Sequence, residues 1–183
     1  MNSSRILVAG LGNIFLGDDA FGAETIRTLQ GEPVPEGVTV KDFGIRSCDL
    51  AYAMLEGYDA VILVDATPRG KSPGTLSVIA LDLPAPPDDE ETGANGRRLS
   101  PDAVLRLAAA FGAPMGALYL VGCEPAISES TGDEIGLSPP VQAAIPGAVA
   151  IIRSLLAQFL SATPVNLGAF AGTVADTGPA GRK

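Results

Sequence analysis

The stretch Gly10-Leu-Gly-Asn-Ile-Phe-Leu-Gly-Asp-Asp-Ala-Phe-Gly22 decides the fold of this chain. An apolar run at residues 6–9 precedes it and has the length and composition of a buried parallel strand. A helical pattern follows it, with Phe21, Ile26 and Leu29 on one face. The unit is therefore a strand, a glycine-rich turn, an acidic pair and a helix. In open α/β sheets such turns lie at the carboxyl ends of the strands, where ligands bind.

A dinucleotide site is the first alternative, because Gly10-Leu-Gly12 begins like the G-x-G-x-x-G fingerprint. Phe15 occupies the position of the third glycine. Asp18 and Asp19 stand at the start of the helix, where a phosphate needs bare N–H groups and a positive field. Two anions there suit a cation, a general base or stabilisation of the helix start. The sequence therefore predicts no nucleotide cofactor.

Composition limits the class of protein further. The chain has 183 residues, 46% of them apolar, and a net charge of −9. We expect a single domain over residues 1–161 and a disordered tail over residues 162–183, which are rich in Gly, Ala, Thr and Pro. No apolar run approaches the ~20 residues of a membrane span, and no basic stripe is present for nucleic acid. With no room for a signal peptide before the first strand, we expect a cytoplasmic monomer.

Strands alternate with helices along the chain. This order predicts a three-layer αβα sandwich around a mostly parallel five-stranded sheet with one antiparallel edge strand. The strand after the loop at residues 67–74 has too short a connection for a crossover helix, so we expect it to run antiparallel to the strand at residues 60–64. Ser47 is expected to be the N-cap of a helix that reaches about residue 56. The five strands are expected at residues 5–10, 38–43, 60–64, 75–81 and 117–122.

The chain contains no histidine. This excludes Ser-His-Asp and Cys-His catalysis and any metal site that includes histidine. Cys48 and Cys123 form no C-x-x-C motif and are expected to be reduced thiols. Cys123 has no histidine to activate it, so it is disfavoured as a nucleophile. The neighbouring Glu124 either shapes the crevice at the sheet edge or is a solvated loop acid.

Three aspartates occupy the same kind of position. Asp19 follows the first strand, Asp42 ends the second and Asp65 ends the third. Each has a structural explanation by itself, because Asp stabilises the first turn of a helix and caps loops. If the three strands are neighbours, however, the carboxylates face one edge of the sheet and repel each other unless they share a cation or proton. This convergence favours a functional site, with Asp19 in it and Asp18 in a structural role.

These residues resemble the [NiFe]-hydrogenase maturation endopeptidases. The resemblance extends in order from about residue 5 to residue 157. It rests on the glycine turn with its acidic pair and on four further motifs: Asp42-Phe-Gly44, Val61-Ile-Leu-Val-Asp65, Val121-Gly-Cys-Glu-Pro125 and Ile135-Gly-Leu-Ser138.

The resemblance implies an endopeptidase that removes a C-terminal extension from the hydrogenase large-subunit precursor after nickel insertion, with nickel presented by the substrate. It places two metal-contacting positions at Asp19 and Asp65, and Asp42 beside them. The family's third position is a histidine, which falls here on Arg97, or on Asn95 if two residues are inserted. A guanidinium cannot bind a metal, and an amide offers only a weak oxygen.

Two functions remain open at this point. In the first, the protein is a working protease whose Asp19 and Asp65, assisted by Asp42, need fewer metal ligands because substrate cysteines already hold the nickel. In the second, it is a degenerate relative that binds the precursor or another partner without cleaving it. The second gains weight because carboxylates alone favour harder ions than nickel.

Overall fold

The structure is a computed structural model that describes residues 4–82, 100–126, 136–161, 164–167 and 174–176. A mixed sheet crosses it in the order β2-β1-β3-β5-β4-β6. The strands are β1 (Ile6–Leu11), β2 (Val38–Gly44), β3 (Tyr58–Ala66), β4 (Leu76–Ala80), β5 (Met115–Cys123) and β6 (Val174–Asp176). The helices are α1 (Phe21–Gln30), α2 (Ser47–Met54), α3 (Pro101–Ala110) and α4 (Pro139–Leu160), and a 3₁₀ turn, η1 (Gly17–Ala20), precedes α1.

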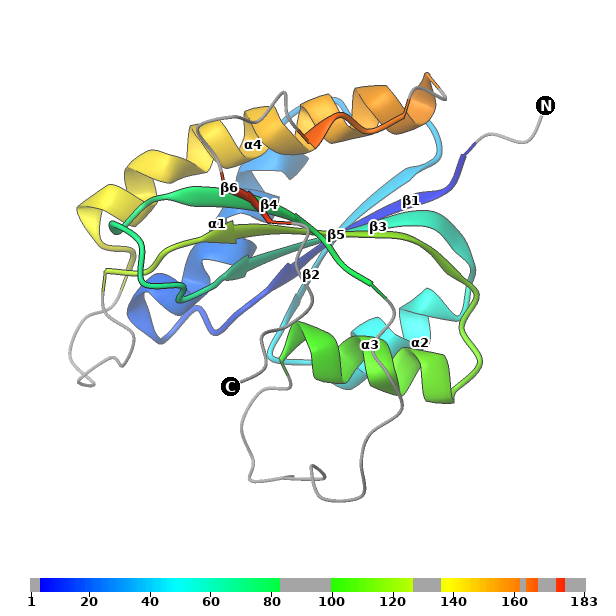
Figure 1. Ribbon diagram of the computed structural model, residues 1–183. Coiled ribbons are helices and arrows are strands. Elements are labelled where there is room, and N and C mark those ends of the chain that lie inside the picture. Colours follow the sequence, from blue (N-terminus) through cyan, green and yellow to red (C-terminus); the bar gives the residue numbers. More distant parts are fainter. Residues whose placement is uncertain (1–3, 83–99, 127–135, 162–163, 168–173, 177–183) are drawn as a thin grey trace.

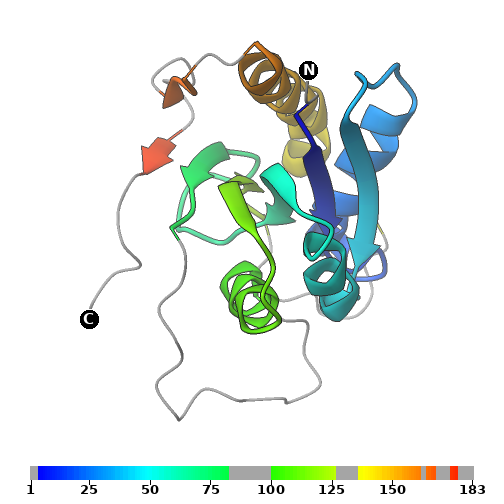
Figure 2. The same ribbon diagram turned by 90° about the vertical axis from the view of Figure 1, so that its right-hand side faces the viewer.

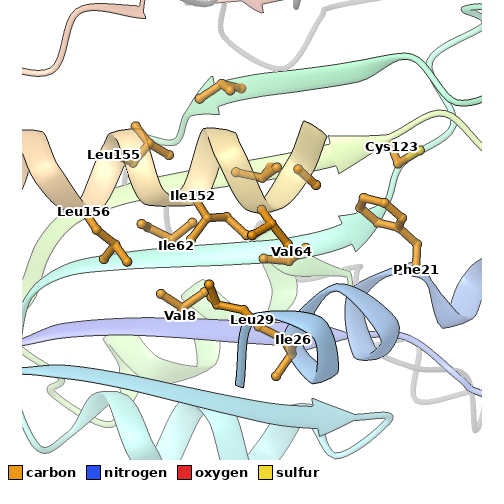
Figure 3. Close-up of a cluster of buried hydrophobic side chains, with 14 of the residues drawn as sticks. Val8, Phe21, Ile26, Leu29, Ile62, Val64, Cys123, Ile152, Leu155 and Leu156 are labelled. Carbon is orange, nitrogen blue, oxygen red and sulfur yellow. The ribbon is translucent and has the colours of Figure 1, made fainter. Parts of the chain in front are cut away.

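Helices cover both faces of the sheet, so the expected three-layer αβα sandwich is confirmed. Helices α1 and α4 pack on one face, and α2 and α3 pack on the other (Figures 1 and 2). All six residues of β1 are buried, as a strand covered on both faces requires. Figure 3 shows the core under α4, where Ile152 lies beside Ile62 of β3.

The antiparallel strand has a different neighbour from the one expected. β4 pairs antiparallel with β5 and not with β3. β5 lies between the two and pairs in parallel with β3. The reason is that α3 provides the crossover that returns the chain to the sheet beside β3. The five expected strands are all present.

The structure places a short strand within residues 162–183, the segment that we expected to be disordered. Val174–Asp176 form β6, which pairs in parallel with β4 and extends the sheet by a sixth strand (Figure 1). Val165 and Leu167 are partly buried and pack against the hydrophobic cluster to which α4 contributes. The remaining residues of 162–183 lie outside the described ranges. Ser47 also differs from expectation, since it is the first residue of α2 and Arg46 takes the N-cap position.

Helix α4 is the most apolar of the described helices. Its length and an 18-residue window of mean hydropathy 1.7 are sufficient for a membrane span by composition alone, a test that buried core helices also pass. Its buried side chains face the sheet: Val141, Ala148, Val149, Ile152, Leu155 and Leu156. The structure therefore uses α4 as a core helix.

Candidate functional site

The glycine turn after β1 folds tightly over the backbone of Asp19. Gly12 has a φ of 124°, and a Cβ atom there would lie 1.8 Å from the carbonyl oxygen of Asp19. Only glycine fits such a position, because a side chain would require both a strained backbone and a displaced turn. The close approach of the turn therefore fixes the position of the Asp19 backbone.

Hydrogen bonds fix the side chain of Asp19 as well. Its Oδ2 accepts a bond from the backbone N–H of Asn13 at 2.6 Å, and the side chain is half-buried. Asn13 in turn accepts a bond from the N–H of Phe15 at its Oδ1, which closes a small turn. These two hydrogen bonds therefore hold the side chain of Asp19 in a defined position.

Gly22 serves helix packing. A Cβ atom at Gly22 would lie 2.1 Å from the carbonyl oxygen of Leu11 and 2.4 Å from that of Val64. The first turn of α1 therefore lies directly against the ends of β1 and β3. This contact brings η1, which carries Asp19, against β3, which carries Asp65.

The strand register places the other two aspartates at the same edge. Gly10 of β1 is opposite Asp42 of β2 and also opposite Val64, the residue before Asp65 in β3. The expectation that the three strands are neighbours is therefore confirmed. Asp42 is exposed, whereas Asp65 is buried, with 2% of its surface accessible.

The turn after β2 is joined to the glycine turn. Oδ1 of Asp42 accepts a bond from the N–H of Gly44 at 2.8 Å. The carbonyl oxygen of Gly44 accepts a bond from the N–H of Gly12 at 3.1 Å. The loops that carry Asp19 and Asp42 therefore form one hydrogen-bonded surface at the carboxyl end of the sheet, where α/β proteins bind their ligands.

Asp18 has a structural role. Its carboxylate accepts three hydrogen bonds, from the N–H of Ala126 at 2.8 Å and from the N–H and hydroxyl of Ser138 at 2.7 and 2.9 Å. These bonds tie η1 to the loop after β5 and to the start of α4. The division of labour expected for the acidic pair, with Asp18 structural, agrees with these contacts.

Glu124 is a residue whose role the sequence left open. It is buried, and its two carboxylate oxygens accept bonds from the N–H groups of Arg69 at 2.7 Å and Gly70 at 3.1 Å. It therefore shapes the loop that follows β3 and is not a solvated acid. The signal in the sequence was its position after β5, at the same sheet edge as Asp65.

Cys123 is unsuited to nucleophilic chemistry. Burial, with the carboxylates of Asp18 and Glu124 nearby, raises the pKa of its thiol to about 12. The thiolate is the nucleophilic form of cysteine, so this residue is inert near neutral pH. Cys48, by contrast, is exposed, and both cysteines are free thiols.

Within the described residues, the side chains at this edge of the sheet do not form a set that would hold a metal ion by itself. Among the described residues, no three His, Cys, Asp or Glu side chains lie together so that they could hold a metal. Asn95 and Arg97, the two candidates for the third position, lie outside the described residues. Asp19 and Asp65 contribute carboxylates only, since the chain has no histidine.

Comparisons with known proteins agree with one another. Residues 23–155 match the family model described as HycI, hydrogenase maturation protease. The chain is 34% identical to hydrogenase expression/formation protein HupM of Azotobacter chroococcum, over 86% of this chain and 74% of that protein. It is 31% identical to the hydrogenase 2 maturation protease of Escherichia coli, over 83% of this chain and 90% of that one.

Solved structures of similar fold come from the same family of proteins. The solved structure of the hydrogenase maturating endopeptidase HybD from Escherichia coli superposes with a TM-score of 0.65 at 28% identity. It covers 85% of this chain and 93% of that chain.

Proposed function

Because this chain belongs to the hydrogenase maturation protease family, we propose that it is an endopeptidase acting on a [NiFe]-hydrogenase large-subunit precursor. The bond it hydrolyses is the one that joins the C-terminal extension to the body of the precursor. We further propose that it acts in the cytoplasm, as a monomer. Free thiols at both cysteines support a reducing compartment.

The observation that carries this proposal is the arrangement of Asp19, Asp42 and Asp65. They end or follow three neighbouring strands. The turns beside Asp19 and Asp42 are joined by the hydrogen bond from the N–H of Gly12 to the carbonyl oxygen of Gly44. The three side chains do not form a metal-binding group among the described residues, but stability alone does not favour three acids at one sheet edge, where their charges repel one another. A site that handles a cation or a proton does.

Nickel is assigned to the substrate and not to the protease. The described residues hold no three-ligand set, and the chain offers no imidazole nitrogen. Carboxylates by themselves prefer harder ions. A nickel centre that the precursor already ligates needs only one or two outer contacts from this chain, which Asp19 and Asp65 would supply.

The chain's own residues then perform an acid–base hydrolysis. Asp19 is the partly exposed carboxylate and takes a proton from water as the hydroxyl oxygen attacks the scissile carbonyl carbon. The proton passes to the departing amine when the peptide bond breaks. Asp65 contributes a buried carboxyl group at the end of β3, and Asp42 assists from the exposed turn after β2.

One observation favours a second function. The absence of histidine leaves the site with fewer donors than a metal-reading protease of this family would use, as the sequence resemblance implies. A chain that binds the precursor without cleaving it would show the same fold and the same turns. The two functions differ in whether the precursor loses mass.

The experiment is a set of single-turnover cleavage assays on nickel-loaded precursor. Asp19→Asn and Asp65→Asn each remove the carboxylate but keep the shape, and we expect each to lower the cleavage rate at least ~100-fold. Asp42→Asn is expected to have a smaller effect because it assists. The matched control is Asp102→Asn, an exposed aspartate in α3, which should cleave at the wild-type rate.

Folding is checked in the same samples by thermal unfolding. Asp65 is buried, so Asp65→Asn counts only if its unfolding temperature stays close to that of the wild type. If Asp19→Asn and Asp65→Asn both cleave as fast as Asp102→Asn, the proposed catalytic site is wrong. If no protein in the set cleaves although the wild type binds the precursor, the chain is a binder.

A further inference from the structure

The loop beside Asp19 exposes apolar side chains that the chemistry above does not use. Phe15 is 75% exposed, with Ile14 at 48% and Leu16 at 44% on either side. Ile45, in the turn after β2, is 58% exposed. We call these four residues the apolar rim: Ile14, Phe15, Leu16 and Ile45.

The apolar rim is displayed by a fixed backbone. The N–H groups of Phe15 and Leu16 donate to Oδ1 and to the carbonyl oxygen of Asn13, both at 3.0 Å. The N–H of Asp19 donates to the carbonyl oxygen of Leu16 at 3.0 Å. These hydrogen bonds hold the backbone of the loop in the conformation that exposes its apolar side chains to solvent. A preorganised apolar group loses little conformational freedom when a partner covers it.

The apolar rim belongs to the same surface as the candidate site. Asn13 begins the loop and donates its N–H to Asp19, while Gly12 bonds to Gly44, next to Ile45. A protein that brings a peptide bond to Asp19 must therefore lie against these side chains. Residues 10–17 carry no charged side chain, which favours an apolar surface as the partner of this loop.

From this continuity we propose that the apolar rim is the docking surface for the folded body of the precursor, on an apolar patch next to its cleavage site. This inference rests on the proposed function, since it takes the precursor as the occupant. Phe15 is the central anchor, because a rigid exposed aromatic residue flanked by smaller apolar contacts has the anatomy of an interface hot spot. Asp19 and Asp65 act on the bond after docking.

The test measures binding and cleavage of the nickel-loaded large-subunit precursor separately. Phe15→Ser is compared with Leu160→Ser, a 40%-exposed residue at the far end of α4. That end lies about 30 Å along the helix from Ser138, which contacts η1. We expect Phe15→Ser to weaken precursor binding and raise KM at least tenfold with kcat unchanged, and Leu160→Ser to change neither. Apolar contact also predicts that this loss is the same at low and high ionic strength.

The outcomes separate this inference from the proposed function. If the wild type cleaves and Phe15→Ser has the wild-type KM, the docking surface is wrong while the protease stands. If the wild type binds without cleaving, weaker binding by Phe15→Ser supports the docking surface although the protease proposal fails. If the wild type does not bind the precursor, or if Phe15→Ser abolishes only self-association of the chain, the precursor is not the occupant and the inference is overturned.

Discussion

At the scale of single residues, the adjacent aspartates Asp18 and Asp19 have different environments. Asp18 is buried and accepts three hydrogen bonds from Ala126 and Ser138. Asp19 is half-buried and is bonded to its own loop through Asn13. The first carboxylate joins distant segments, and the second is held at the edge of the sheet. We therefore propose the chemical role for Asp19 and not for Asp18.

Replacing Asp18 should destabilise the fold. Asp18→Ala leaves the N–H of Ala126 and both donors of Ser138 without their acceptor, and each lost bond costs roughly 0.5–1.5 kcal/mol. We expect the free energy of unfolding to fall by about 2–4 kcal/mol in urea titration. Asp102→Ala, which removes only an exposed charge at a helix start, should cost less than ~1 kcal/mol. Equal losses in the two variants would contradict the structural role of Asp18.

The two cysteines should differ in reactivity. Iodoacetamide at neutral pH should label the exposed Cys48 and leave Cys123 unmodified in the folded protein, because its pKa of about 12 keeps the thiol protonated. Peptide mass mapping before and after unfolding measures this. Rapid labelling of Cys123 in the native protein would show that the thiol is not buried as described.

The same raised pKa gives a pH dependence of stability. The folded state keeps the Cys123 proton up to about pH 12, whereas the unfolded chain releases it near the usual pKa of 9.0. The unfolded state therefore binds fewer protons between these values, and stability falls as the pH rises through this window. Cys123→Ala should flatten the fall in urea midpoints above pH 9. Curves of equal slope would rule out Cys123 as the cause.

At the scale of elements, the sequence predicted the layers, the five strands and the neighbouring positions of the three strands that Asp19, Asp42 and Asp65 end or follow. Period and composition are local, and β1 and β3 carry them as continuous buried runs. The neighbour of β4 was not predictable in this way, because the crossover through α3 depends on packing with β3. The prediction that Ser47 is an N-cap was wrong. Ser47 is the first residue of α2, and its buried hydroxyl has no hydrogen-bond partner among the described residues. The partners of Asp18 lie 108 and 120 residues away, a separation that no motif reveals.

The contact between α1 and the sheet depends on Gly22. Gly22→Ala would place a methyl group against the carbonyl oxygens of Leu11 and Val64, both of them backbone atoms that cannot yield cheaply. Overpacking of this kind costs about 1–3 kcal/mol, and we expect thermal unfolding to show a loss at the upper end. Gly31→Ala, at the end of the same helix with a φ of −70°, should change stability by less than ~1 kcal/mol. A stable Gly22→Ala variant would contradict the close approach.

At the scale of the whole molecule, Asp19, Asp42 and Asp65 lie at one edge of the sheet, and the apolar rim belongs to the loops at that edge. The family of the chain was predictable from the sequence because the glycine turn and the strand-end aspartates stand in the expected order. Whether the site cleaves was not predictable, because the histidine that the resemblance calls for is absent. In the function proposed above, nickel ligands supplied by the precursor would compensate for the missing histidine.

The most direct test of the central claim is the intact mass of nickel-loaded large-subunit precursor after incubation with the purified chain. We expect the precursor to lose the mass of its C-terminal extension with the wild-type chain and to keep it with Asp19→Asn. A precursor that keeps its full mass while it co-purifies with the wild-type chain would contradict the account.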